Sequence, residues 1–156
     1  MIKIIFFALG IIVLDQAVKL WVLASFALGE ARPFIPGVLQ LRYVQNTGMA
    51  FGLLAEHQWI FLIFNPLILI AVTAFVVKTK IFTGKAQQFA FAAFVAGGFS
   101  NWIDRIAHGF VVDMFEPTFM RFAVFNVADI FIILGAIVLF VAYALSETRK
   151  HRIKGV

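Results

Sequence analysis

The sequence predicts an all-α membrane protein with four transmembrane helices and a small extracytoplasmic β element. Of the 156 residues, 63% are hydrophobic and 13% are charged, whereas soluble domains are about half apolar and a quarter charged. Four long apolar stretches follow one another, and a segment with a two-residue apolar period lies between the first two. The core of one domain of this size cannot hide so much apolar surface, so most of the chain must face lipid.

The four spans follow from length and hydropathy. A bilayer core requires about 20 mostly apolar residues per helix, which predicts spans at roughly 4–28, 59–77, 86–107 and 122–145. The first resembles a signal peptide but is longer than usual and contains charges, so we expect an uncleaved helix. In the second, which has no charge, we expect a local bend at Pro66. Without repeats or a separate soluble segment, residues 1–156 form one domain.

The basic residues predict the orientation. Lysines and arginines in short loops favour the cytoplasmic side, and eight of the thirteen fall on one side if the chain crosses four times. They are Lys3, Lys78, Lys80, Lys85, Arg149, Lys150, Arg152 and Lys154. Both termini are then cytoplasmic. The basic tail is compatible with RNA binding, but after a membrane helix such a tail more often contacts anionic lipid headgroups. We therefore expect membrane lipid as a binding partner of the chain, and no nucleic acid.

The outer side then receives residues 29–58 and 108–121. In the longer connection, Leu39, Leu41 and Tyr43 alternate with mostly polar neighbours, as in a strand. Pro36-Gly37 precedes them as a turn signal. We therefore expect the β element within residues 29–58.

Ionisable residues within or beside membrane spans are candidates for function. There are six, namely Asp15, Lys19, Asp104, Arg105, Asp113 and Asp129. Asp15 and Lys19 are four residues apart, so they share a helix face and can pair. The pair either fixes helix packing or belongs to a proton pathway.

The third span ends in AGGFSNWIDRIAHG. Its small residues Ala96, Gly97 and Gly98 allow close helix approach. Asn101, Asp104 and Arg105 cluster near the outer surface. Asp104 is interpreted first as an interfacial anchor that pairs with Arg105, whereas the guanidinium of Arg105 also suits carbonyl groups of a bound chain.

Asp113 and Asp129 lie at similar depth near the outer face when the third and fourth spans are antiparallel. Two neighbouring carboxylates can split their pKa values, so that one holds a proton while the other is ionised. An aspartic protease needs this arrangement. Spacing alone also allows the two groups to have unrelated roles.

Other chemistries lack their residues. The chain contains no cysteine, which excludes disulfides and thiolate chemistry. The three histidines are scattered, so we expect no metal site and no cofactor. The segment NTGMAFG at residues 46–52 predicts a turn in which glycine allows close backbone approach.

The motifs LDQAVK, NTGMAFG, GGFSNWIDR, VVDM and FNVAD, in this order, resemble the lipoprotein signal peptidase family, the signal peptidase II aspartic endopeptidases. The resemblance spans nearly the whole chain. It implies catalytic roles for Asp113 and Asp129. It also implies roles in substrate binding or site support for Asp15, Lys19, Asn46, Gly48, Ala50, Gly97, Asn101, Asp104, Arg105, Asn126 and Ala128. Ser100, Met114 and Ile130 differ from the residues that the family usually has at these positions. We expect these differences to change local packing more than activity.

The resemblance further implies a diacylglyceryl-prolipoprotein substrate, cut before its lipidated cysteine, in the bacterial cytoplasmic (inner) membrane with the site facing outward. The acyl chains must remain in the bilayer, because extraction costs about 0.8 kcal/mol per CH₂. The alternative hypothesis is a small proton-coupled transporter or channel subunit, which would need ionisable groups through the whole membrane thickness. A non-catalytic assembly subunit would need neither acid pair nor cleft.

Overall fold

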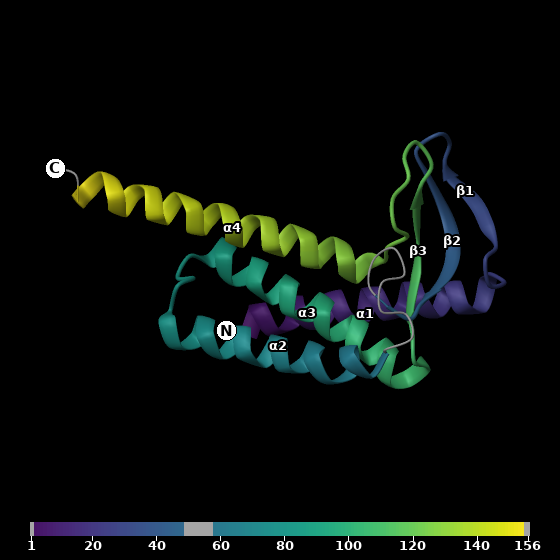
Figure 1. The fold of residues 1–156 in the computed structure, drawn as a ribbon, viewed down its shortest axis with the longest axis horizontal. Helices are drawn as coiled ribbons and strands as arrows, with labels where there is room; N and C mark the ends of the chain where they lie inside the picture. The colour runs from purple at the N-terminus through teal and green to yellow at the C-terminus, as the bar shows by residue number, and fades with distance from the viewer. Residues whose placement is uncertain (1, 49–57, 155–156) are drawn as a thin grey trace.

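In the computed structural model, which describes residues 2–48 and 58–154, four long helices lie beside a small sheet (Figure 1). The helices are α1 (Ile2–Ser25), α2 (Gln58–Thr79), α3 (Lys85–His108) and α4 (Val127–Lys154). The strands are β1 (Ala31–Ile35), β2 (Leu39–Asn46) and β3 (Val111–Pro117). The sheet lies at one end of the helix bundle, and both termini and the α2–α3 loop lie toward the other.

Three of the described helices, α1, α2 and α4, are long and apolar enough to cross a membrane. Our expectation of four such spans is therefore met only in part. The helix α3 has the required length but carries the polar side chains Gln87, Gln88, Ser100, Asn101 and Asp104. It packs against α1, α2 and α4, so its buried face contacts protein instead of lipid.

Three of the rough span ends differ from the helix ends by three residues or more, and one of them is the end of the last helix, at Lys154 instead of 145. The first helix ends at Ser25 instead of 28, and the last begins at Val127 instead of 122. Although residues 122–125 are apolar, Phe125 pairs in a β bridge with Phe115, and its backbone N–H donates to the Phe115 carbonyl at 3.0 Å. This pairing keeps the segment extended until Asn126.

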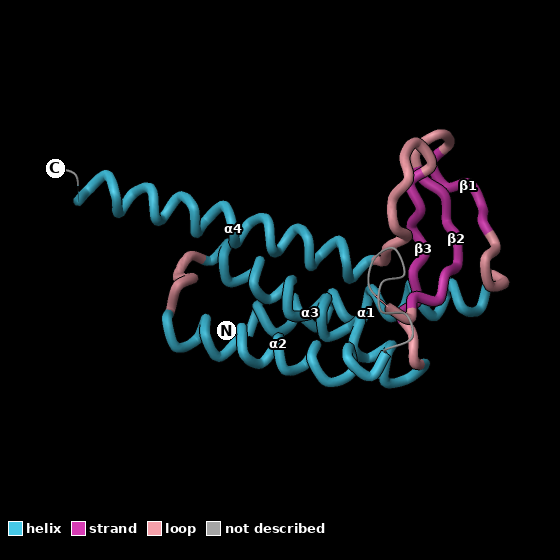
Figure 2. Tube along the Cα trace, viewed as in Figure 1, coloured by secondary structure: helices cyan, strands magenta, loops and turns pink. Residues whose placement is uncertain are grey.

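The predicted β element is confirmed and larger than expected. The strands form an antiparallel sheet in the order β1-β2-β3 (Figure 2). The turn at Pro36-Gly37 joins β1 to β2, and Gly37 adopts a φ of 73° that favours glycine. The third strand, from the shorter connection, was not predicted. It pairs Asp113 with Val44 and Val111 with Asn46, which brings two predicted site residues together on neighbouring strands.

The end of α1 and the sheet share a hydrophobic core. Val22 of α1 and Phe26, which directly follows this helix, pack against Tyr43, Val112 and Met114. Burial of these five side chains fixes the sheet over the end of the bundle, so that β3 and the start of α4 meet at α3.

Candidate active site

Asp113 and Asp129 both line one cleft of about 260 Å³. Asp113 comes from β3, where 1% of the residue is exposed, and Asp129 lies in the first turn of α4. Asn46, Gly48, Asn101 and Arg105 also line the cleft, with apolar side chains of the β3–α4 connection and α4. The sequence predicted Asp113 in the connection at residues 108–121. In the structure this residue lies on β3, from which its side chain lines the cleft.

The local sequence FNVAD explains how Asp129 is held. Asn126 is the N-cap of α4, and its Oδ1 accepts the backbone N–H of Asp129 at 2.9 Å. In return, Asp129 Oδ2 accepts the backbone N–H of Asn126 at 3.1 Å. This is a reciprocal capping box. It fixes the Asp129 carboxylate at the N-terminus of α4, over the first backbone N–H groups of the helix.

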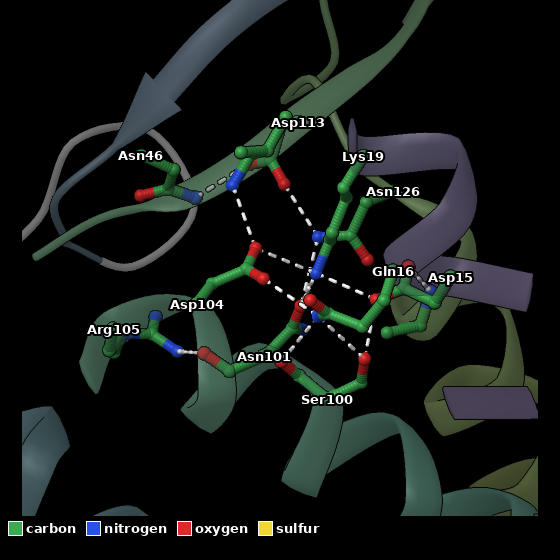
Figure 3. A network of polar contacts seen from close by, with 12 residues as sticks. Asp15, Gln16, Lys19, Asn46, Ser100, Asn101, Asp104, Arg105, Asp113 and Asn126 are labelled. Carbon is green, nitrogen blue, oxygen red and sulfur yellow. Dashed lines mark hydrogen bonds and ion pairs between the residues drawn. The ribbon is translucent and has the colours of Figure 1, made fainter. Parts of the chain in front are cut away.

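Three asparagine side chains orient the two carboxylates. Asn46 Nδ2 donates to Asp113 Oδ2 at 2.9 Å, and Asn126 Nδ2 donates to Asp113 Oδ1 at 2.7 Å. Asn101 Nδ2 donates to Asp129 Oδ1 at 2.8 Å. Figure 3 shows Asp113 with Asn46 on one side and Asn126 on the other. Each carboxylate therefore keeps a fixed orientation.

Burial, and after it the charge of the nearby Asp129, raise the pKa of Asp113 to about 7. The amides of Asn46 and Asn126 and the charge of Lys19 oppose this shift in pKa. Asp113 is therefore able to hold a proton near neutral pH beside a carboxylate placed at a helix N-terminus. The acid–base pairing of Asp113 with Asp129 stays a prediction.

Lys19 lies below the cleft in a buried ionic network. Its Nζ contacts Asp15 Oδ2 at 2.8 Å, Asp104 Oδ2 at 2.9 Å and Asn101 Oδ1 at 2.8 Å. The Asn101 amide continues to Asp129, so Lys19 is one side chain away from the cleft. Lys19 and both carboxylate residues are at most 2% exposed. Desolvated charges of this kind need all their partners.

The two carboxylates of the network brace four elements. Asp15 Oδ1 accepts the backbone N–H of Ala128 at 2.8 Å, and Asp104 Oδ2 accepts that of Val112 at 3.0 Å. These bonds tie α1 to the start of α4, and α3 to β3. Of the interpretations of Asp15 and Lys19, the structure favours the packing pair. The proposed Asp104–Arg105 anchor was wrong, because Asp104 pairs with Lys19.

Two polar side chains for which the sequence predicted no site role complete the network. Gln16 Nε2 donates to Asp104 Oδ1 at 2.8 Å, and Ser100 Oγ donates to Asp15 Oδ2 at 2.7 Å. Gln16 directly follows Asp15, so the LDQAVK motif carried the signal. Within the described residues, no buried side-chain nitrogen or oxygen lacks a hydrogen-bond partner.

Arg105 occupies the wall of the cleft. Its Nη2 donates to the Gly48 carbonyl at 3.2 Å and its Nη1 to the Asn101 carbonyl at 3.3 Å. The guanidinium carbon lies 5.0 Å from the ring centroid of Phe61. The backbone N–H of Gly48 donates to Asn46 Oδ1 at 3.0 Å, which confirms a turn at the start of NTGMAFG. Ala50 lies outside the described residues.

The expected close approach of helices is present at Gly97. A Cβ atom there would lie 2.6 Å from the Ala128 carbonyl oxygen, closer than side-chain carbons approach. Gly97 thus lets α3 reach the first turn of α4, where Asp129 sits. Among the residues that the structure describes, no group of three or more His, Cys, Asp or Glu is placed to hold a metal ion.

Comparisons with known proteins agree with this geometry. A family model described as signal peptidase (SPase) II matches residues 7–145. A lipoprotein signal peptidase of Streptococcus pyogenes is 40% identical over 129 residues, which are 83% of this chain and 84% of that protein. One from Lactococcus lactis subsp. cremoris is 40% identical over 140 residues, covering 89% and 91%.

The fold has solved counterparts. The structure of a bacterial membrane enzyme superposes with a TM-score of 0.84 at 29% identity and covers 94% of this chain and 89% of its own. A second bacterial membrane enzyme gives a TM-score of 0.77 at the same identity, with coverages of 90% and 91%. Since the family model spans most of the sequence and the relatives match along nearly their whole length, the chain belongs to the signal peptidase II family.

Proposed function

We propose that Asp113 and Asp129 act as the catalytic pair of this enzyme. As a member of its family, the chain is a lipoprotein signal peptidase, an aspartic protease that removes signal peptides from prolipoproteins. The observation that carries the assignment is a single cleft lined by both carboxylates, each held in place by asparagine amides. Burial raises the pKa of Asp113 to about 7, and Asp129 lies at a helix N-terminus.

In the proposed reaction, ionised Asp129 takes a proton from water as the water oxygen attacks the scissile carbonyl carbon. Protonated Asp113 gives its proton to the carbonyl oxygen, forming a tetrahedral diol. Asp113 then recovers a proton from the diol while Asp129 protonates the leaving amine, and the C–N bond breaks. Both groups return to their starting states, with no covalent intermediate and no cofactor.

The substrate is a prolipoprotein carrying diacylglyceryl-cysteine, cut before that residue. The large apolar side chains exposed on the helices, such as Phe6, Ile70 and Phe140, suit contact with lipid. A cleft beside the membrane lets the acyl chains stay in the bilayer, where each CH₂ is worth about 0.8 kcal/mol.

The orientation has both termini in the cytoplasm and the cleft on the outer side of the bacterial inner membrane. The basic residues near the termini and the α2–α3 loop support this orientation, because both lie toward the end of the bundle away from the sheet (Figure 1). If α3, which packs against the other three helices, is the fourth crossing, the chain crosses the membrane an even number of times and both termini lie on the same side. Alkaline phosphatase fused at residue 45 should be active and at residue 80 inactive. The reverse result would overturn the orientation.

The catalytic pair is tested by cleavage of a lipidated prolipoprotein peptide with purified Asp113→Asn and Asp129→Asn variants. Each should nearly abolish cleavage without unfolding, because a carboxamide is nearly isosteric but cannot take up the proton. The double variant should lose little more, since the two groups act as one unit. Glu116→Gln, on the same strand but paired with Arg42, is the matched control. Substantial turnover by either single variant, or a chelator effect reversed by added metal, would overturn the mechanism.

A further inference from the structure

Pro66 leaves a gap in the backbone hydrogen bonds of α2. Proline has no N–H, so the carbonyl of Leu62, four residues earlier, cannot receive its usual helical bond from residue 66. Trp102 of α3 supplies the missing donor, because its Nε1 donates to the Leu62 oxygen at 3.0 Å. The indole is a donor only, so this bond uses its full capacity.

The same line of contacts continues along α2 and α3. Asn65 Nδ2 donates to the Gly98 carbonyl at 3.1 Å. A Cβ atom on Gly98 would lie 3.0 Å from Leu69 Cδ2, so the two helices are close at this point. At the other end, Phe61, next to Leu62 in the chain, lies beneath the guanidinium of Arg105. The Trp102 bond therefore satisfies the carbonyl freed by Pro66, and the residue next to that carbonyl, Phe61, contacts Arg105 in the wall of the cleft.

We propose that Trp102 is a positioning residue for cleavage: its bond to the Leu62 carbonyl freed by Pro66 fixes α2 against α3 and so holds Phe61 against the guanidinium of Arg105, which lines the cleft. Trp102 itself does not line the cleft. It acts through Arg105, whose guanidinium also spans from Asn101 to Gly48. The inference rests on the proposed function and adds to it that Arg105, as a cleft-lining residue, contacts the substrate.

The test compares purified wild type, Trp102→Phe, Pro66→Ala and the double variant, by KM and kcat on a lipidated prolipoprotein peptide below the thermal midpoint. Trp102→Phe should raise KM about fivefold, the scale of one lost neutral hydrogen bond. In Pro66→Ala, the N–H of residue 66 can bond to Leu62, so adding Trp102→Phe should leave KM almost unchanged. Trp59→Phe, at a tryptophan that is 56% exposed on α2, is the matched control.

Phe61→Leu completes the comparison. It should raise KM as Trp102→Phe does, and combining the two should add little, because both act through Arg105. Unchanged KM with a lower thermal midpoint in Trp102→Phe would overturn the proposal in favour of helix packing alone. An equal rise in KM with and without Pro66 would show that the indole ring matters and the hydrogen bond does not. Cleavage that survives Asp113→Asn would count against the catalytic pair and leave this comparison intact.

Discussion

Asn126 donates a hydrogen bond of 2.7 Å from Nδ2 to Asp113 Oδ1. The other end of the same amide caps α4, where its Oδ1 accepts the backbone N–H of Asp129. One side chain thus orients the first carboxylate and fixes the helix turn that carries the second. Helix stability and site geometry are coupled at this residue.

Substitution of Asn126 should separate these two roles. In Asn126→Ser, the hydroxyl still accepts a backbone N–H as an N-cap but is too short to donate to Asp113 and Asn101, so we expect a smaller loss of thermal stability than in Asn126→Ala and at least about tenfold slower cleavage. Asn126→Ala loses the cap as well, which costs about 1 kcal/mol more in unfolding free energy. Thermal unfolding and kcat on the lipidated peptide measure both quantities. Wild-type kcat in Asn126→Ser would show that the bond to Asp113 is dispensable.

The pH dependence of cleavage should have an alkaline limb near pH 7. Cleavage requires a proton on Asp113, whose pKa burial raises to about 7, so kcat/KM should fall as pH rises through this value. The limb is an apparent property of the coupled pair. A profile that stays flat from pH 6 to about 9 would contradict the assignment of Asp113 as the proton donor.

Substitution of Asn46 tests whether the alkaline limb follows the pKa of Asp113. Its amide stabilises the ionised form of Asp113 and so lowers the pKa of that group. Asn46→Ala should therefore move the alkaline limb of kcat/KM to higher pH. Gln45→Ala is the matched control, because its amide donates to the Tyr43 hydroxyl at 2.8 Å and not to Asp113. A shift to lower pH would contradict the role of this bond.

Long apolar runs were enough to predict the helices, the two-residue alternation predicted the hairpin of β1 and β2, and the order of the motifs predicted the family. The third strand was not readable, because Val111, Val112, Asp113 and Met114 are all buried and show no alternation. Its partner strand is also remote in sequence, as the pairing of Val44 with Asp113 shows. Contacts of this kind depend on tertiary structure and leave no local pattern.

The ion pairs also show that contacts within one helix can be predicted from the sequence and contacts between helices cannot. The four-residue spacing predicted the bond between Asp15 and Lys19, which the structure confirms. The second partner of Lys19 is Asp104 on another helix, and sequence adjacency wrongly suggested Arg105 instead. The capping box of Asn126 and Asp129 was readable in FNVAD, where an N-cap residue precedes an acid by three positions.

Gly97 offers a direct test of how closely α3 must approach the first turn of α4. In Gly97→Ala, the new Cβ would lie 2.6 Å from the Ala128 carbonyl oxygen, and this backbone atom cannot move freely because Asp15 holds the Ala128 N–H. Relief requires α3 and α4 to separate, which overpacking data put at about 1–3 kcal/mol.

Separation would also lengthen the 2.8 Å bond from Asn101 on α3 to Asp129 on α4. We therefore expect Gly97→Ala to lower both the thermal midpoint and kcat, measured on the same purified protein. Gly10→Ala is the matched control, since a Cβ there meets nothing within 4 Å and alanine favours a helix. If Gly97→Ala lowered the midpoint but kept wild-type kcat, the spacing of α3 and α4 would matter for folding and not for the position of Asp129.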